Sequence, residues 1–264
     1  MKFFLEIIKG IFIGAGAILP GISSGVLCVA FGIYEKILDS VLGFFHNTKE
    51  NFKFLFPLVI GIVIGIILFG NILKYLFSTY NVISSFCFAG LVLGSIPSIL
   101  KQAQVHKLRF YHILALLLTF SCSICLVLIE KNGHSYIYSN NSAFSFTLTG
   151  FAMSAGVVIP GVSSTVILML LGKYDYYLSA ISSLNLKILL PLGIGLALGA
   201  IVLLLFIKFM FRHFKSLTYF AIIGFILGSI PVLIPNITKS GDIVFGAIST
   251  VFGLLVSIKL SALH

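Results

Sequence analysis

Two matching phrases of proline, glycine and hydroxyl residues are the parts of this chain best suited to chemistry. Each phrase opens with a Pro-Gly pair and continues with adjacent hydroxyl side chains before an apolar segment. Because proline and glycine break helices, a new helix is expected to begin there with free backbone N–H groups. A helix start of this kind attracts anions, phosphate above all. We therefore predict two anion-binding tips, whose candidate substrate-binding residues are Pro20, Gly21, Ser23, Ser24 and Gly25 in the first tip and Pro160, Gly161, Ser163, Ser164 and Thr165 in the second tip.

The hydroxyls of the two tips could instead cap their own helices. A serine or threonine at a helix start commonly accepts a hydrogen bond from the backbone of the first turn. Capping explains one hydroxyl per helix better than two adjacent hydroxyls in both copies. Contact with a ligand is favoured, because broken helices bind the substrate in many transporters.

Glu35 and Asp175 are the matched acids that follow the two phrases. Each lies beyond the expected short helix, where a carboxylate gains nothing from the helix dipole. Two interpretations remain open. The acids are either solvated at the membrane interface beside Lys36 and Lys173, or they are protonatable groups coupled to transport.

Metal or redox chemistry has little support in the sequence. Cys122 and Cys125 lie one turn apart inside an apolar run, with no second pair beside them. Small apolar packing is the favoured role for such cysteines. The six histidines have no ligand-like spacing, so we expect neither a metal site nor a cofactor.

The composition is that of an integral membrane protein. Hydrophobic residues form 59% of the chain and charged residues only 9%, against about 25% charged residues in soluble domains. The apolar runs that approach the length of a bilayer span are 54–77, 83–100, 108–129, 188–211, 217–234 and 243–260. The net charge of +10 reflects Lys and Arg at the ends of these runs and does not indicate nucleic-acid binding.

The chain is an internal duplication. Residues 10–38 align with 150–178, and eleven of the 29 aligned positions are identical. Residues 57–100 then align with 191–234, and the five letters Leu93–Pro97 recur without change. We predict an all-α fold with two repeats.

Each predicted repeat contains a broken element followed by three spanning helices. The broken elements are 3–33 and 144–172, and the repeats are 1–131 and 142–264. The segment after each break has about 12 residues, or roughly 18 Å of helix, against a hydrocarbon core of about 30 Å. We therefore predict re-entrant helical hairpins, which are allowed at that depth only beside protein or a water-filled cavity.

The predicted topology is inverted between the repeats. A hairpin plus three crossings is an odd number, so the second repeat enters from the opposite side. With the N-terminus inside, twelve of the 17 Lys and Arg residues fall on the inner side. The positive-inside rule then places both termini and the 39–53 linker in the cytoplasm and the 130–143 linker outside. Lys74 and Lys208 match in the alignment and are expected to snorkel at helix ends.

The two phrases, read as Pro20 to Glu35 and Pro160 to Asp175, resemble those of the polyprenyl-phosphate transporter family. The resemblance covers essentially the whole chain, because both halves carry the phrase. It implies a multi-pass protein of the bacterial cytoplasmic membrane that returns undecaprenyl phosphate from the outer to the inner leaflet for cell-wall synthesis. Its partners would be this lipid phosphate and membrane lipids. Ser24, Gly25 and Val26 stand where the family pattern has a Gly-Gly-Thr-like run.

Two alternatives come from other functional classes. Undecaprenyl-pyrophosphate phosphatases share the hairpins and Pro-x-Ser phrases, but hydrolysis needs a base and a cation beside the phosphate. Neither a His nor an Arg lies near Ser24 or Ser164, so transport is favoured over an enzyme. A carrier or channel for a small anion is compatible with the same residues and stays open.

Overall fold

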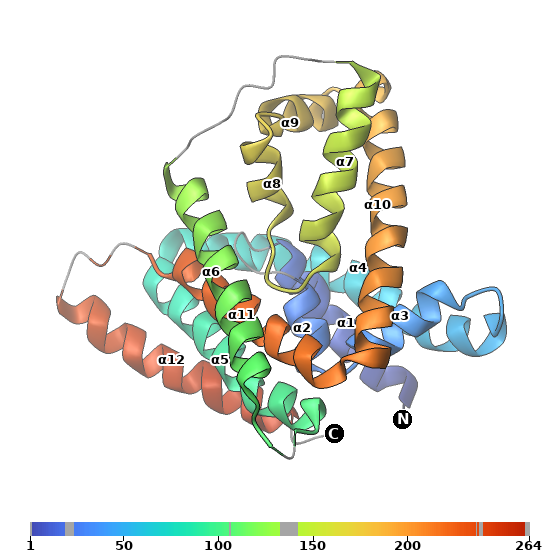
Figure 1. The fold of residues 1–264 in the computed structure, drawn as a ribbon. Helices are drawn as coiled ribbons and strands as arrows, with labels where there is room; N and C mark the ends of the chain where they lie inside the picture. The colour runs from blue at the N-terminus through green and yellow to red at the C-terminus, as the bar shows by residue number, and fades with distance from the viewer. Residues whose placement is uncertain are drawn as a thin grey trace.

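A computed structural model describes residues 2–18, 24–105, 107–132, 142–235, 237 and 240–261. Twelve α-helices form the regular structure of this part of the chain (Figure 1). Their bounds are α1 Lys2–Ile18, α2 Ser24–Ala30, α3 Tyr34–Leu42, α4 Thr48–Thr79, α5 Asn81–Ala103, α6 Phe110–Asn132, α7 Ala143–Val158, α8 Ser164–Leu170, α9 Tyr174–Ser182, α10 Leu186–His213, α11 Lys215–Leu233 and α12 Ser240–Ser261.

Five helices are long and apolar enough to cross a membrane. These segments are Thr48–Leu68, Asn81–Ala103, Phe110–Leu128, Leu186–His213 and Gly241–Lys259. They confirm five of the six predicted spanning runs. The sixth run, 217–234, corresponds to a shorter apolar segment, Lys215–Pro231 in α11. The chain is therefore a multi-pass membrane protein.

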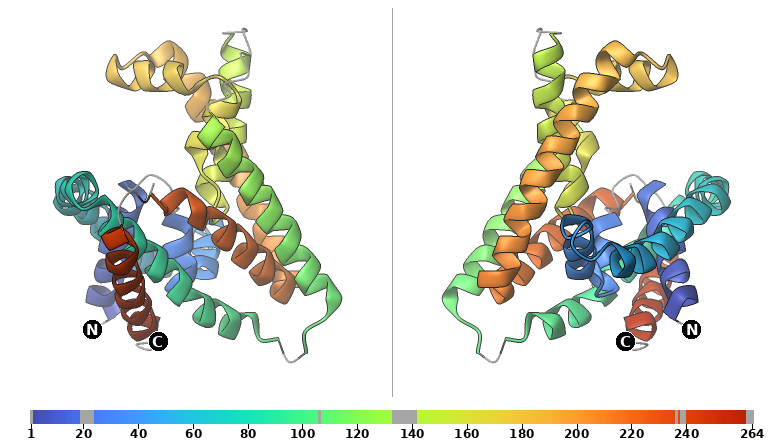
Figure 2. Two further views of the ribbon diagram at one scale, coloured as in Figure 1. Left: turned by 90° about the vertical axis from the view of Figure 1, so that its left-hand side faces the viewer. Right: turned by 90° about the vertical axis from the view of Figure 1, so that its right-hand side faces the viewer.

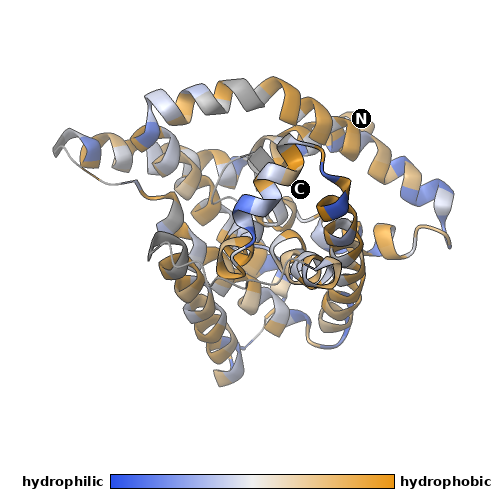
Figure 3. Cartoon of the chain, turned by 90° about the horizontal axis from the view of Figure 1, so that it is seen from above, coloured by the Kyte–Doolittle hydropathy of each residue, from blue (hydrophilic) through white to orange (hydrophobic). Residues whose placement is uncertain are grey.

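The long helices are hydrophobic over most of their length (Figure 3), and many of their large apolar side chains are exposed. On α10 they form a stripe at helical spacing, and each member is at least half exposed: Ile194, Leu198, Ile201, Leu205 and Phe209. Each Å² of such surface costs about 25 cal/mol in water. A lipid bilayer removes this cost, which explains why the sequence places its hydrophobic residues outside as well as inside.

Glycines let α1 pack closely on α4, and α7 on α10. A Cβ on Gly10 would collide with the carbonyl oxygen of Leu58, and a Cβ on Gly150 would collide with that of Leu192. These two contacts occupy aligned positions of the two halves. Small residues allow helix backbones to approach in this way inside membranes.

The remaining large helix pairs join one half of the chain to the other. α5 packs on α12, and α6 packs on α11. Gly90 contacts the backbone of Thr250 in the first pair, and Gly224 contacts that of Leu116 in the second. These positions also correspond under the sequence alignment, so the core between the halves uses the same contact twice.

The short helices differ from the sequence prediction. α2 and α8 each have seven residues, rather than about twelve, because a glycine in the left-handed conformation ends each one. Gly32 has φ of 65° and Gly172 has φ of 62°. The N–H of Ile33 donates to the carbonyl of Cys28 at 3.0 Å, which is the Schellman arrangement of a helix end.

Two additional helices, α3 and α9, follow these ends and were not predicted. Each has nine residues. α3 and the early start of α4 occupy most of the 39–53 segment, which the sequence had indicated as a polar linker. In the side views, α9 projects at one end of α7 and α10 (Figure 2), whereas α3 packs on α4 and α10.

The main core lies between α2, α3, α5, α10 and α11. Its fully buried members include Val29 of α2, Ile99 of α5 and Ile226 of α11. Val158, the last residue of α7, belongs to the same cluster. The end of α7 and the segment after the first tip therefore share one core.

Candidate functional site

The second tip is a turn between α7 and α8 that is seated against the middle of α11. Pro160 is almost fully buried, and Gly161 has φ of 85°. A Cβ on Gly161 would lie 2.8 Å from the carbonyl carbon of Phe225. Both the positive φ and the close approach require glycine here, and this explains the second Pro-Gly pair. α8 then returns beside α7 (Figure 1).

The hydroxyls of the second tip do not behave as simple helix caps. Ser163 is the N-cap residue of α8, yet its side chain makes no capping hydrogen bond. Ser163, Ser164 and Thr165 are all partly exposed. Within the described residues, none of the three hydroxyls has a hydrogen-bond partner. Capping therefore does not account for Ser163, and ligand contact at these residues stays a prediction.

The first tip can be followed only in part. The predictions for Pro20, Gly21 and Ser23 lie outside the described residues. Ser24 is the first residue of α2, and Gly25 is buried. Whether the two tips share one cavity also stays a prediction.

The position of the matched acids corrects one expectation. Glu35 lies in the first turn of α3, and Asp175 lies in the first turn of α9. A carboxylate at a helix start is stabilised by the helix dipole, so the expectation that they gain nothing from a dipole is wrong. The error arose because α3 and α9 were not predicted.

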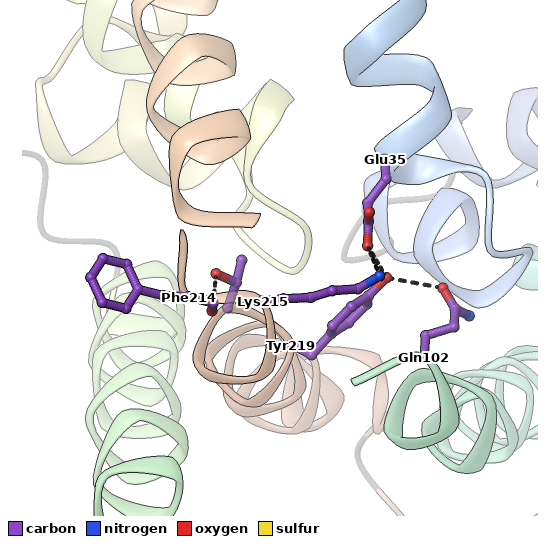
Figure 4. A network of polar contacts seen from close by, with 6 residues as sticks. Glu35, Gln102, Phe214, Lys215 and Tyr219 are labelled. Carbon is purple, nitrogen blue, oxygen red and sulfur yellow. Dashed lines mark hydrogen bonds and ion pairs between the residues drawn. The ribbon is translucent and has the colours of Figure 1, made fainter. Parts of the chain in front are cut away.

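Glu35 joins a polar network that links three helices (Figure 4). The hydroxyl of Tyr219 on α11 donates to Glu35 Oε1 at 2.5 Å and lies 3.2 Å from Oε1 of Gln102 on α5. Lys215 Nζ, at the start of α11, lies 3.4 Å from Glu35 Oε1. Glu35 is thus an ion-paired and hydrogen-bonded acid of an interhelical contact, and Lys215 rather than Lys36 is its cation.

A second ion pair lies one turn further along α3. Lys208 Nζ on α10 is 2.7 Å from Asp39 Oδ1. Lys208 therefore has an ion-pair partner that the snorkelling expectation did not include. The side chain of the matched Lys74 is outside what the structure describes.

A pocket of about 310 Å³ lies beside the Asp39–Lys208 pair and is lined by Glu35, Leu38, Asp39, Lys208, Phe211 and Arg212. No ion pair of Arg212 occurs among the described residues. With Lys215, the cations of this cluster exceed the acids by one.

Asp175 has a different environment from Glu35. It is exposed on α9, and the described residues give it no ion pair. The neighbouring Lys173 is only 1% exposed, with its ammonium 5.1 Å from the ring centre of Phe146. Lys173 is therefore not the solvated partner that the sequence suggested for Asp175.

Tyr34 connects the first phrase to the second tip. Its hydroxyl donates to the carbonyl oxygen of Val158 at 2.6 Å, in a buried contact. Burial raises the pKa of Tyr34, so the hydroxyl remains a donor at neutral pH. This hydrogen bond joins the start of α3 to the end of α7.

Sequence reasoning missed most of the cluster around Glu35. Tyr219, Gln102 and Arg212 have no counterpart in the matched phrases. Asp39 carried a usable signal, because it is one of only seven acidic residues in the chain. Among the described residues, no group of three or more His, Cys, Asp or Glu side chains could hold a metal.

The fold and this site define a polytopic membrane protein with two broken helical elements and a charged contact between its halves. The profile of the VCA0040-like, undecaprenyl phosphate translocase-like family matches residues 13–244. The chain belongs to this family, which confirms the resemblance read from the two phrases.

Two relatives match over most of their length. A polyprenyl-phosphate transporter of Staphylococcus aureus is 28% identical over 273 residues, covering 97% of this chain and 95% of that protein. A polyprenyl-phosphate transporter of Vibrio cholerae is 25% identical over 251 residues, covering 89% and 79%. No solved structure matches the chain. The relatives are named as transporters, which confirms the prediction of a transporter rather than an enzyme.

Proposed function

We propose that this protein moves undecaprenyl phosphate from the outer to the inner leaflet of the bacterial cytoplasmic membrane. The observation that carries the proposal is the family match over residues 13–244. A relative of nearly equal length that is named for polyprenyl phosphate supports the same substrate class. The movement would recycle the carrier lipid for cell-wall synthesis.

We infer that residues 1–131 and 142–264 are inverted repeats. The order of one long, two short and three long helices occurs in both halves. Aligned glycines at Gly10 and Gly150, and at Gly90 and Gly224, meet equivalent backbone atoms. α1 begins at the end of the molecule where α12 finishes, whereas α7 begins at the opposite end (Figures 1 and 2). These features support opposite orientations and termini at one end of the molecule, and the positive-inside rule would place that end in the cytoplasm.

The tips are the proposed phosphate site. α2 and α8 would be the returning arms of re-entrant hairpins, since about 10 Å of helix cannot cross a core of about 30 Å. The free backbone N–H groups of the first turn could receive a phosphate monoester. The hydroxyls of Ser163, Ser164 and Thr165, which have no hydrogen-bond partner among the described residues, could do the same. With only seven residues per helix, these local donors matter more than a long macrodipole.

Glu35 and Asp175 are candidate groups for proton coupling. Acids near membrane pathways often serve as proton relays. Because Glu35 and Asp175 have different surroundings, each could take up or release a proton in a different state of the transporter. If they couple transport to protons, Glu35→Gln and Asp175→Asn variants should still move lipid but lose the response to a pH gradient.

The test is a proteoliposome assay that detects undecaprenyl phosphate separately in each leaflet, with and without a pH gradient. Movement of lipid by the purified protein, without release of free phosphate from undecaprenyl pyrophosphate, is expected. Release of phosphate at catalytic rates would instead indicate a phosphatase. Flux of inorganic phosphate or sulfate that lipid phosphate does not inhibit would favour a small-anion carrier.

A further inference from the structure

The two halves are packed differently at their short helices, although their long helices pack alike. α3 contacts α10 of the other half, but its counterpart α9 packs on α8 and α10 of its own half and has no comparable contact with α4. α2 packs on α5 of its own half, whereas its counterpart α8 packs on α6 of the other half. In two views α9 stands at the far end of α7 and α10 (Figures 1 and 2). In transporters built from inverted repeats, one repeat moves against the other around a fixed site. If the two halves are such repeats, the unequal packing implies a second arrangement in which the contacts at the α3 end open.

Charged contacts follow the same inequality. Asp39 and Glu35 on α3 pair with Lys208 and Lys215 of the other half. Asp175 on α9 has no ion pair in the described part of the chain. The buried bond from Tyr34 to the carbonyl of Val158 also joins the halves at this end.

The strength of these pairs suits a contact that must open. The side chains of Asp39 and Lys208 are 65% and 42% exposed, and those of Glu35 and Lys215 are 36% and 41% exposed. Exposed ion pairs are weak, because water competes for both charges. Such pairs can hold one arrangement and still break within a transport cycle.

We propose that the ion pairs Asp39–Lys208 and Glu35–Lys215 form a gate that closes the transport path at the α3 end. This inference rests on the proposed function for the path itself. The assignment makes these side chains positioning residues for transport, rather than residues that hold the phosphate.

The gate can be tested without measuring transport. Leu38 lines the pocket beside the pairs and is 2% exposed, so a Leu38→Cys probe should react slowly with a water-soluble thiol reagent. The probe is placed in a background in which the four native cysteines are replaced. Asp39→Asn or Lys208→Gln should speed its labelling by roughly 1.5- to five-fold, as expected for the loss of weak pairs. The charge swap Asp39→Lys with Lys208→Asp should restore slow labelling and shows that the protein is folded.

Cross-linking tests whether opening is needed for transport. A disulfide or short cross-link between Asp39→Cys and Lys208→Cys should abolish leaflet-to-leaflet movement of undecaprenyl phosphate, and reduction should restore it. The matched control links Asn81→Cys to Ser85→Cys, since the side chains of Asn81 and Ser85 lie 2.9 Å apart within α5. That cross-link should leave movement intact.

Two outcomes would overturn the proposal: unchanged labelling of the Leu38→Cys probe in both single variants, or full movement by the 39–208 cross-linked protein. A protein that moves no undecaprenyl phosphate would refute the proposed function, while the labelling result would still decide the gate.

Discussion

A serine that begins a helix without capping it is available to another acceptor or donor. Ser163 is such a residue, because it occupies the N-cap of α8 but makes no side-chain capping bond. The structure thus separates two roles that the sequence could not separate at this position. The distinction also gives the mutation a clear expected outcome.

Ser163→Ala should weaken binding of undecaprenyl phosphate while leaving the unfolding midpoint in detergent unchanged. A true N-cap would lose about 1 kcal/mol of stability, whereas a hydrogen bond to a charged ligand contributes roughly 1.5–3 kcal/mol. Affinity should therefore fall by about ten-fold or more. Ser24→Ala and Ser164→Ala should act in the same direction, and Ser24→Asp should be worse because its carboxylate would occupy the donors. Ser78→Ala, an exposed serine at the end of α4, is the control. Unchanged binding in all four tip variants would remove the tips from the site.

Gly161→Ala should destabilise the protein, because this glycine has φ of 85° and a Cβ would lie 2.8 Å from the Phe225 backbone. Strained backbone conformations of this kind cost about 1–3 kcal/mol. Gly193→Ala is the matched control, since a Cβ there has nothing within 4 Å. It should be neutral or stabilising by up to about 1 kcal/mol. Thermal unfolding of both variants in detergent measures the difference, and equal midpoints would contradict the described seating of the tip on α11.

At the scale of elements, the most extensive helix–helix contacts show which segments need one another in order to fold. α5 packs mainly on α12 and α6 mainly on α11, so each half of the chain supplies a partner that the other half needs. The apolar runs of the sequence located these helices well, since hydrophobic length sets where a spanning helix can form. They could not say which helices pair, because the contacts that specify pairing are between residues far apart in the sequence.

The two halves, residues 1–132 and 142–264, should assemble when they are expressed together as separate chains. Each half alone leaves the glycine-lined faces of its fifth and sixth helices without a partner, for example at Gly90 and Gly224. Co-purification through a tag on one half measures the assembly. A monodisperse, stable 1–132 fragment on its own would contradict this dependence.

At the scale of the whole molecule, the start of α1 and the end of α12 lie at the same end (Figures 1 and 2). The ion pairs of α3 lie where α10 ends and α11 begins. Under the proposed topology this is the cytoplasmic end, so the path would be closed inside and open toward the outer leaflet. That arrangement suits a protein that collects a lipid phosphate from outside.

Cysteine labelling should place the turn between α3 and α4 in the cytoplasm. His46 is exposed in this turn, so a His46→Cys variant without the native cysteines should react with an impermeant thiol reagent only after the membrane is opened. The expectation follows from the predicted topology, which puts twelve of the 17 basic residues on the inner side, as the positive-inside rule favours. A residue 46 that reacts in intact cells would contradict both the topology and the re-entrant hairpin.

Sequence alone determined the membrane class, the places of the long helices and the family, because these depend on composition, hydrophobic length and motifs that are local in the chain. It also located Glu35 and Asp175 as a matched pair. Only the tertiary structure decided that Glu35 begins a helix and pairs with Lys215, while Asp175 on its own helix remains exposed. The physical reason is that two aligned residues with nearly the same chemistry acquire different environments when the halves pack unequally, and unequal packing is a property of long-range contacts that no local pattern records.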